Sequence, residues 1–124
     1  MKTYIVVPAH NEERFIAETL SSLVSQTLLP KKIVVVNDNS TDNTCAIVNN
    51  FINQYDFISL VHSNASKDHM PGSKVIHAFY KGYTTLDTDY DIICKFDADL
   101  IFPKDYIEKI TDTFKKNNRI GMVG

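Results

Sequence analysis

Two carboxylates, Asp97 and Asp99, stand one residue apart directly after the mostly apolar run Ile92–Phe96. This run is expected to form a buried strand, and ligands of α/β proteins bind at the carboxyl ends of parallel strands. Two acids at such a place repel each other unless a cation lies between them. Mg²⁺ held by one or two carboxylates typically also binds phosphate. The pair therefore predicts a metal-diphosphate site, and a turn cap with a solvated acid is the alternative.

Polar side chains also follow the first predicted strand, Thr3–Pro8. His10 and Asn11 come directly after it. The ring of His10 could stack on a nucleotide base, or it could simply belong to a surface turn. Asn11 is suited to cap the next helix, because asparagine is favoured at that position and acidic residues follow it.

The second predicted strand, Ile33–Val36, is followed by the polar segment 37–42. Within it, Asp38 could accept a hydrogen bond from a base imide, or it could form an Asx turn. Lys74 stands at the expected start of a later helix, where it and the backbone N–H groups could neutralise a diphosphate. The carboxyl ends of parallel strands lie along one edge of a sheet, so these groups are expected to converge on one crevice.

Strands and helices alternate along the whole chain. Apolar residues at helical spacing separate short apolar runs that are typical of strands buried on both faces. This alternation predicts an α/β fold with a parallel sheet, helices on both faces and a polar loop over Ser63–Gly72. The predicted strands are Thr3–Pro8, Ile33–Val36, Phe57–Val61, Ile92–Phe96 and a last one beginning within Arg119–Gly124; the predicted helices run from Asn11 to Pro30, over Val48–Tyr55, over Val75–Leu86 and from Pro103 to Phe114.

The bulk properties narrow the function classes. The 124 residues suffice for one domain with a core, and the net charge of −2 gives no reason to expect nucleic acid as a partner. No apolar stretch approaches the length of a membrane span. Cys45 and Cys94 fall within predicted regular elements, which favours a reducing, cytoplasmic environment. Neither a dinucleotide-binding glycine motif nor a P-loop is present.

Four separated segments resemble the family 2 glycosyltransferases, which have the GT-A fold, a Rossmann-like α/β/α sandwich. The resemblance runs from residue 3 to the end of the chain. It rests on the order and spacing of Tyr4–Glu13, Ser21–Thr27, Val34–Thr44 and Asp97–Asp99.

This resemblance implies a nucleotide-sugar donor, usually a UDP-sugar, and transfer to an acceptor with inversion at the anomeric carbon. It implies that residues 1–124 are the donor-binding, N-terminal part of a longer enzyme of polysaccharide biosynthesis, and that the general base lies beyond Gly124. Association with a membrane would then also come from segments outside this chain. By position, the donor-binding residues would be Pro8, His10, Asn11, Asp38, Lys74 and Asp97, and a Mn²⁺ or Mg²⁺ ion would be held by Asp99, the better candidate for direct coordination, and Asp97.

The chain departs from the family pattern at two positions. Asn37 stands where the first acid of an Asp-Asp-Gly-Ser motif is usual, and Tyr80 stands where an asparagine is usual. Three other functions stay open at this point. A non-catalytic nucleotide-binding domain would keep the same crevice, a nucleotidyltransferase would carry a basic glycine-rich loop after its first strand, and a response regulator would carry acids after its first and third strands.

Overall fold

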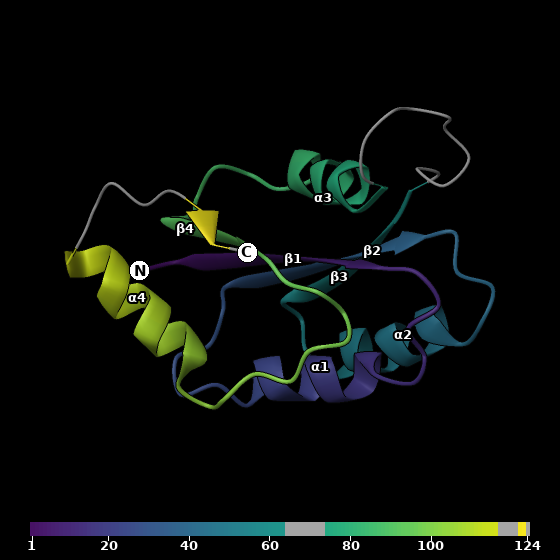
Figure 1. Cartoon of the computed structure of the whole chain (residues 1–124), viewed down its shortest axis with the longest axis horizontal. Coiled ribbons are helices and arrows are strands. Elements are labelled where there is room, and N and C mark those ends of the chain that lie inside the picture. The colour runs from purple at the N-terminus through teal and green to yellow at the C-terminus, as the bar shows by residue number, and fades with distance from the viewer. Residues whose placement is uncertain (64–73, 117–121, 124) are drawn as a thin grey trace.

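The computed structural model describes residues 1–63, 74–116 and 122–123, with the backbone alone for 74–78 and 122–123. Within these residues strands and helices alternate from end to end (Figure 1). The elements are β1 (Thr3–Ala9), α1 (Ile16–Val24), β2 (Lys32–Asp38), α2 (Thr44–Gln54), β3 (Ile58–Ser63), α3 (Lys74–Thr84), β4 (Ile92–Lys95), α4 (Tyr106–Lys116) and β5 (Met122–Val123).

The strands form one parallel sheet in the order β3-β2-β1-β4-β5. Helices α1, α2 and α4 lie on one face of this sheet, and α3 lies on the other (Figure 1). Because helices cover both faces of the sheet, neither face of the central strands is exposed to water. Every residue of β1 and β2 is buried except Pro8 and Lys32, which are half-buried. The predicted α/β sandwich is confirmed.

Alternate residues of β1 divide the core into two clusters, as the period of a strand requires. Ile5 and Val7 pack with the helices α1, α2 and α4, whereas Tyr4 and Val6 pack with Phe79 of α3. The larger cluster therefore holds three helices on one face, and the smaller cluster fixes α3 to the other.

Gly82 lets α3 approach the sheet closely. A Cβ atom placed there would lie 2.7 Å from a methyl carbon of Val36 and 2.8 Å from one of Val6. Both valines are fully buried and stiff at χ1, so they cannot move aside without shifting the helix.

We expect Gly82→Ala to destabilise the fold by roughly 1–2 kcal/mol, because overpacking of about 1–3 kcal/mol outweighs the helix propensity gained from alanine. Urea denaturation measures the free energy of unfolding. Lys81→Ala, at the exposed neighbouring position, is the control and should change it by less than about 0.5 kcal/mol. Equal stability of Gly82→Ala and the native chain would contradict the close approach.

The first helix differs from its prediction at both ends. It begins at Ile16 without a side-chain cap, because Asn11 adopts a positive φ of 52° and residues 12–15 form a turn instead. It ends at Val24 rather than near Pro30. Beyond that point Thr27 N bonds to Lys104 O at 2.8 Å, so a tertiary contact replaces the next helical hydrogen bonds.

The other boundaries lie close to the predicted ones. The strand predicted over Phe57–Val61 is shifted and runs over Ile58–Ser63, because it pairs with β2 as far as Asp38. The predicted last strand is present as β5, whose bounds fall inside Arg119–Gly124. The predicted loop over Ser63–Gly72 lies outside the described residues, apart from Ser63.

Charged side chains tie the segment between α3 and β4 to the amino ends of the strands. Its acids accept bonds from lysines and a tyrosine that are far away in the sequence. The pairs are Asp87 with Lys32 and Tyr4, and Asp89 with Lys2 and Lys31. These bonds to Lys32, then Tyr4, hold the pKa of Asp87 well below its ordinary value.

This network predicts a loss of stability in acid. A carboxylate whose pKa is lower in the folded chain stabilises the fold above its unfolded pKa, about 3.9, and that stabilisation is lost as the pH falls through the folded value. Asp87→Asn should therefore lower the stability at pH 7 and flatten its dependence on pH below about 4. Thermal melts between pH 2 and pH 7 measure this. Asp112→Asn, at an exposed position of α4, is the control, and an equal effect there would contradict the assignment.

Candidate functional site

The strand order places a crevice between β1 and β4. From β1 the chain winds outward through β2 to β3, and it then returns to form β4 on the other side of β1. At such a point successive connections leave neighbouring strands in opposite directions. Open α/β sheets bind their ligands there, outside the carboxyl ends of the strands. The topology therefore locates the candidate site before any side chain is considered.

Pro8 lies where this crevice opens. Val6 accepts a hydrogen bond from Phe96 N at 3.0 Å and thus faces β4, and alternate residues of a parallel strand face the same neighbour. Pro8, two residues further on, faces the same side, but β4 has ended by then, since its last pair with β1 joins Lys95 to Val6. A proline is tolerated here because no ladder bond needs its missing N–H.

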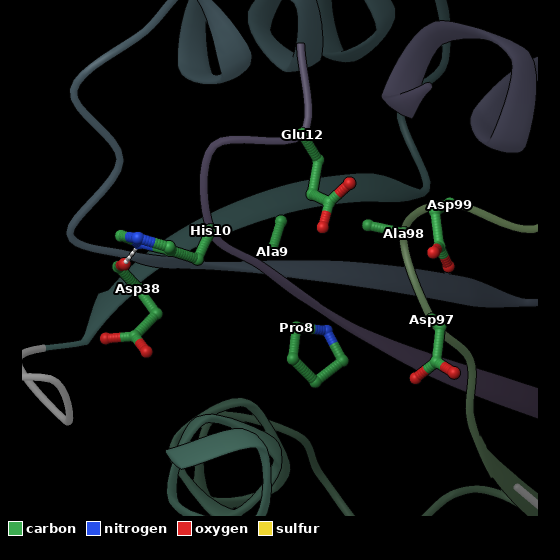
Figure 2. A pocket seen from close by; sticks show the side chains of 8 residues that line it. All are labelled: Pro8, Ala9, His10, Glu12, Asp38, Asp97, Ala98 and Asp99. Atoms are coloured by element: carbon green, nitrogen blue, oxygen red, sulfur yellow. Dashed lines mark hydrogen bonds between the residues drawn. The ribbon is translucent and has the colours of Figure 1, made fainter. Parts of the chain in front are cut away.

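A cavity of about 330 Å³ opens at this edge of the sheet. The carboxylates of Asp38 and Asp97 lie on opposite sides of Pro8, with His10 on the side of Asp38 and Asp99 on the side of Asp97 (Figure 2). The lining residues are Pro8, Ala9, His10, Glu12, Asp38, Asp97, Ala98 and Asp99. The structure thus brings five of the predicted site residues, from three separate strand ends, into one cavity.

The structure places the other two predicted site residues differently. Asn11 is not among the described residues that line the cavity. Its side chain Oδ1 accepts a bond from Thr41 N at 2.8 Å and so joins the β1–α1 loop to the β2–α2 loop. Lys74 is the first residue of α3, as expected, but its side chain lies outside the described part of the structure.

His10 and Asp38 form one end of the cavity. Asp38 is buried, with 6% of its surface exposed, at the last position of β2. Its backbone oxygen lies 2.6 Å from His10 Nδ1, so the main chain of one loop fixes the ring on the other (Figure 2). An aromatic ring beside a buried carboxylate is a combination that could stack on a base and read one of its polar edges.

Asp97 and Asp99 form the other end. Both are exposed, while Ala98 between them is buried, so the strand-like alternation directs both carboxylates away from the core. Lys95 Nζ lies 3.5 Å from Asp97 Oδ1. This lysine partly neutralises Asp97, so the negative charge of Asp99 is the less compensated of the two.

Glu12 lines the cavity although the sequence analysis did not single it out. Partial burial raises the pKa of its carboxyl group, and the negative charges of Asp99 and Asp42 raise it further. The prediction had assigned Glu12 to the first turn of a helix, where an acid only complements the helix dipole. The late start of α1 leaves it in the loop above the cavity instead (Figure 2). The negative potential that raises its pKa is the field that would attract a cation.

Asn37 has a structural part in the loop that carries Asp38. Its Oδ1 accepts a hydrogen bond from Ser40 N at 3.0 Å, and its Nδ2 lies 3.1 Å from His62 Nδ1. An amide can fill both positions because it carries a donor and an acceptor, whereas a carboxylate only accepts. The departure from the usual acid at this position is therefore accommodated within the chain.

The carboxylates fit a divalent cation whose coordination shell would be completed by water and substrate phosphates. Among the described residues, no group of three or more His, Cys, Asp or Glu side chains could enclose a metal ion. Mg²⁺ and similar hard cations, however, are commonly held by one or two carboxylates, with water and substrate phosphates completing the shell. Asp99 and Asp97 supply that number of oxygen donors at an exposed cavity rim.

Comparison with known proteins identifies the family of this chain. The model of the family described as "Glycosyl transferase family 2" matches residues 4–124. A probable glycosyltransferase, YdaM of Bacillus subtilis, is 41% identical over 101 residues, which are 79% of this chain and 23% of that protein. The poly-beta-1,6-N-acetyl-D-glucosamine synthase of Staphylococcus epidermidis is 29% identical over 95% of this chain and 26% of its own length. The chain spans about a quarter of these relatives.

Solved structures share the fold. TarS of S. aureus, residues 1–349, superposes with a TM-score of 0.76 at 24% identity, covering 95% of this chain and 33% of that one. A mannosyltransferase of Pyrobaculum calidifontis in complex with GDP-Man and Mn²⁺ gives a TM-score of 0.75 at 24% identity over 91% of this chain and 32% of that one. The chain therefore belongs to glycosyltransferase family 2 and has the GT-A fold of the nucleotide-sugar transferases.

Proposed function

We propose that residues 1–124 form the donor-binding unit of an inverting glycosyltransferase that uses a UDP-sugar and a divalent cation, Mn²⁺ or Mg²⁺. One observation carries this proposal. A single cavity has a ring and a buried carboxylate, His10 and Asp38, at one end, and the exposed pair Asp97 and Asp99 at the other. A nucleoside diphosphate has the matching polarity, with an aromatic base at one end and an anionic diphosphate at the other.

The structural neighbours are consistent with this donor class. TarS has been solved with UDP-GlcNAc, and that complex superposes with a TM-score of 0.72 at 26% identity, covering 95% of this chain and 32% of that one. The glucosyl-3-phosphoglycerate synthase of Mycobacterium tuberculosis has been solved with Mn²⁺ and UDP, at a TM-score of 0.67 and 22% identity, covering 91% of this chain and 39% of that one. Among uridine and guanosine donors we favour uridine, which is the nucleotide in the TarS complex. Its imide N–H could donate to Asp38, a bond that cytosine cannot form.

The residues of the chain divide the work of donor binding. His10 would stack on the base, Asp38 would hold its imide, and Pro8 would line the floor between them. Asp99, with Asp97, would hold the cation, and Lys74 would stand near the diphosphate. A bound cation acts as a Lewis acid that stabilises the charge on the departing diphosphate. The base that takes the acceptor proton would lie beyond residue 124, and the acceptor is a saccharide, a lipid-linked group or a protein.

We further propose a cytoplasmic setting and a part in polysaccharide synthesis. Cys45 and Cys94 are free cysteines, which fits a reducing compartment. Cys94 is buried, and that burial raises the pKa of its thiol to about 12, which is typical of an inert thiol. The relative that makes poly-beta-1,6-N-acetyl-D-glucosamine supports the class of product. None of the helices that the structure describes is long and apolar enough to cross a membrane.

A transfer assay tests the proposal. A longer form of the protein, continued past Gly124, is expected to transfer a radiolabelled sugar from a UDP-sugar to an acceptor with inversion, which NMR of the product linkage reveals. Residues 1–124 alone should bind the donor but turn over at least ~10²-fold more slowly, because a general base contributes about 10²–10⁴ in rate. Donor binding without transfer by the longer form would favour a non-catalytic binding domain, and retention of configuration would contradict inversion.

A further inference from the structure

The ring of His10 is held at both of its nitrogens. Its Nδ1 lies 2.6 Å from the backbone oxygen of Asp38, and its Nε2 lies 3.4 Å from Nδ2 of Asn11. The first contact is short and the second is long, so Asp38 provides most of the attraction. Together the two contacts determine the plane of the ring at the wall of the cavity.

Each donor and acceptor in the series of contacts from Thr41 through Asn11 and His10 to Asp38 can be assigned. Thr41 N–H can only donate, so the atom of Asn11 that faces it at 2.8 Å is Oδ1, and the amide NH₂ faces His10. That NH₂ can only donate, so Nε2 of His10 accepts and carries no proton. The Asp38 oxygen can only accept, so Nδ1 carries the proton.

Asn11 is itself fixed by the neighbouring loop. Its φ of 52° lies in the left-handed region, which asparagine tolerates better than most residues. Its N–H donates to Ser40 Oγ at 3.0 Å. Two further bonds continue this contact between the loops: Glu12 N donates to Thr44 Oγ1, and Glu13 N donates to Asp42 Oδ2. The loop that carries Asp38 and the loop that carries His10 are thus joined along several residues.

We propose that Asn11 is a positioning residue that, together with the Asp38 backbone oxygen, holds His10 as the Nδ1–H tautomer and fixes its ring plane for stacking. The consequence for nucleotide affinity rests on the proposed function, whereas the tautomer does not. A wall that is already ordered need not be immobilised when the base binds, so its ordering costs nothing at that step. Asn11 would therefore act on the donor without touching it.

Three variants separate the amide from the loop contact. Asn11→Gly keeps the left-handed backbone and removes the amide. Asn11→Asp keeps an acceptor for Thr41 N but offers Nε2 a carboxylate in place of a donor, which favours a proton on Nε2. Ser40→Ala loosens the same pair of loops and leaves the amide beside the ring.

The ring state is read from the ¹⁵N resonances of the His10 imidazole, without nucleotide, and circular dichroism confirms that each variant is folded. The native chain and Ser40→Ala should show a protonated Nδ1 and an unprotonated Nε2. Asn11→Gly should raise the fraction of the Nε2–H tautomer, while Nδ1–H stays the major form because the contact with the Asp38 oxygen remains. Asn11→Asp should raise the fraction of Nε2 that carries a proton still further. An Nε2–H tautomer in the native chain would overturn the assignment, and so would a native pattern in both Asn11 variants or a change in Ser40→Ala as large as that in Asn11→Gly.

The affinity for UDP is then measured by calorimetry. Asn11→Gly should bind UDP about 2- to 10-fold more weakly than the native chain, which corresponds to the ordering of one side chain on binding. Equal affinities would overturn the positioning role even if the tautomer is as assigned. If the native chain binds no UDP while the ring shows the expected tautomer, the proposed function is wrong, but the positioning of the His10 ring by Asn11 is supported.

Discussion

Asp99→Ala is expected to weaken the binding of UDP in the presence of Mn²⁺ by about 100-fold or more. Loss of a residue that merely supports a metal ligand typically costs 10- to 100-fold in metal affinity, so loss of a direct ligand should lie at or beyond the upper end of that range. The affinity of UDP falls with that of the metal, because the cation would join the carboxylate to the diphosphate. Isothermal titration calorimetry measures both affinities on the same protein.

Two further variants sharpen this test. Asp97→Ala should cost less than Asp99→Ala, because the pairing of Asp97 with Lys95 at 3.5 Å already competes with a cation. Asp112→Ala, at an exposed position of α4 outside the cavity lining, should leave the affinity unchanged. An unchanged affinity in Asp99→Ala, or an equal loss in Asp112→Ala, would show that Asp99 does not hold the metal.

Asp38→Ala is expected to reduce the preference for UDP over CDP by about 10- to 100-fold, the worth of one hydrogen bond to a charged group. A carboxylate accepts the imide N–H of uracil, and cytosine has an unprotonated nitrogen at the same place. Asp38 is buried, so the mismatched contact would leave two acceptors facing each other away from water. Competition of UDP and CDP for the same site measures the preference.

Asp38→Asn is the matched variant, because it preserves size and hydrogen-bonding shape. An amide can accept from uracil or donate to cytosine, so this variant should bind the two nucleotides with similar affinity. If the native protein binds CDP as tightly as UDP, then Asp38 does not read the base.

The sequence predicted correctly which side chains lie together, because the topology of the sheet alone determines that. Asp97 and Asp99 follow a buried strand, Asp38 ends another, and His10 follows a third, so a parallel sheet had to bring them to one edge. The prediction needed no side-chain geometry, only the alternation of strands and helices. For the same reason the order of the elements was correct even where their ends were displaced by a few residues.

What the sequence could not predict depends on contacts between distant residues. Asn11 has the residue type of a helix cap, yet it bonds to Thr41 and Ser40, about thirty positions away, and this contact delays the start of α1. Glu12 consequently lies at the cavity rather than in the helix. Local propensity favours the cap, but several hydrogen bonds between two loops outweigh it.

The central claim is that one cavity binds a uridine diphosphate through a divalent cation, and one titration tests it most directly. The affinity of the chain for UDP is measured by calorimetry with Mn²⁺ and again after its removal with EDTA. We expect clear binding with the metal and at least tenfold weaker binding without it, since the carboxylates of Asp97 and Asp99 would then face the diphosphate with no cation between them. Equal affinity in EDTA would contradict the account.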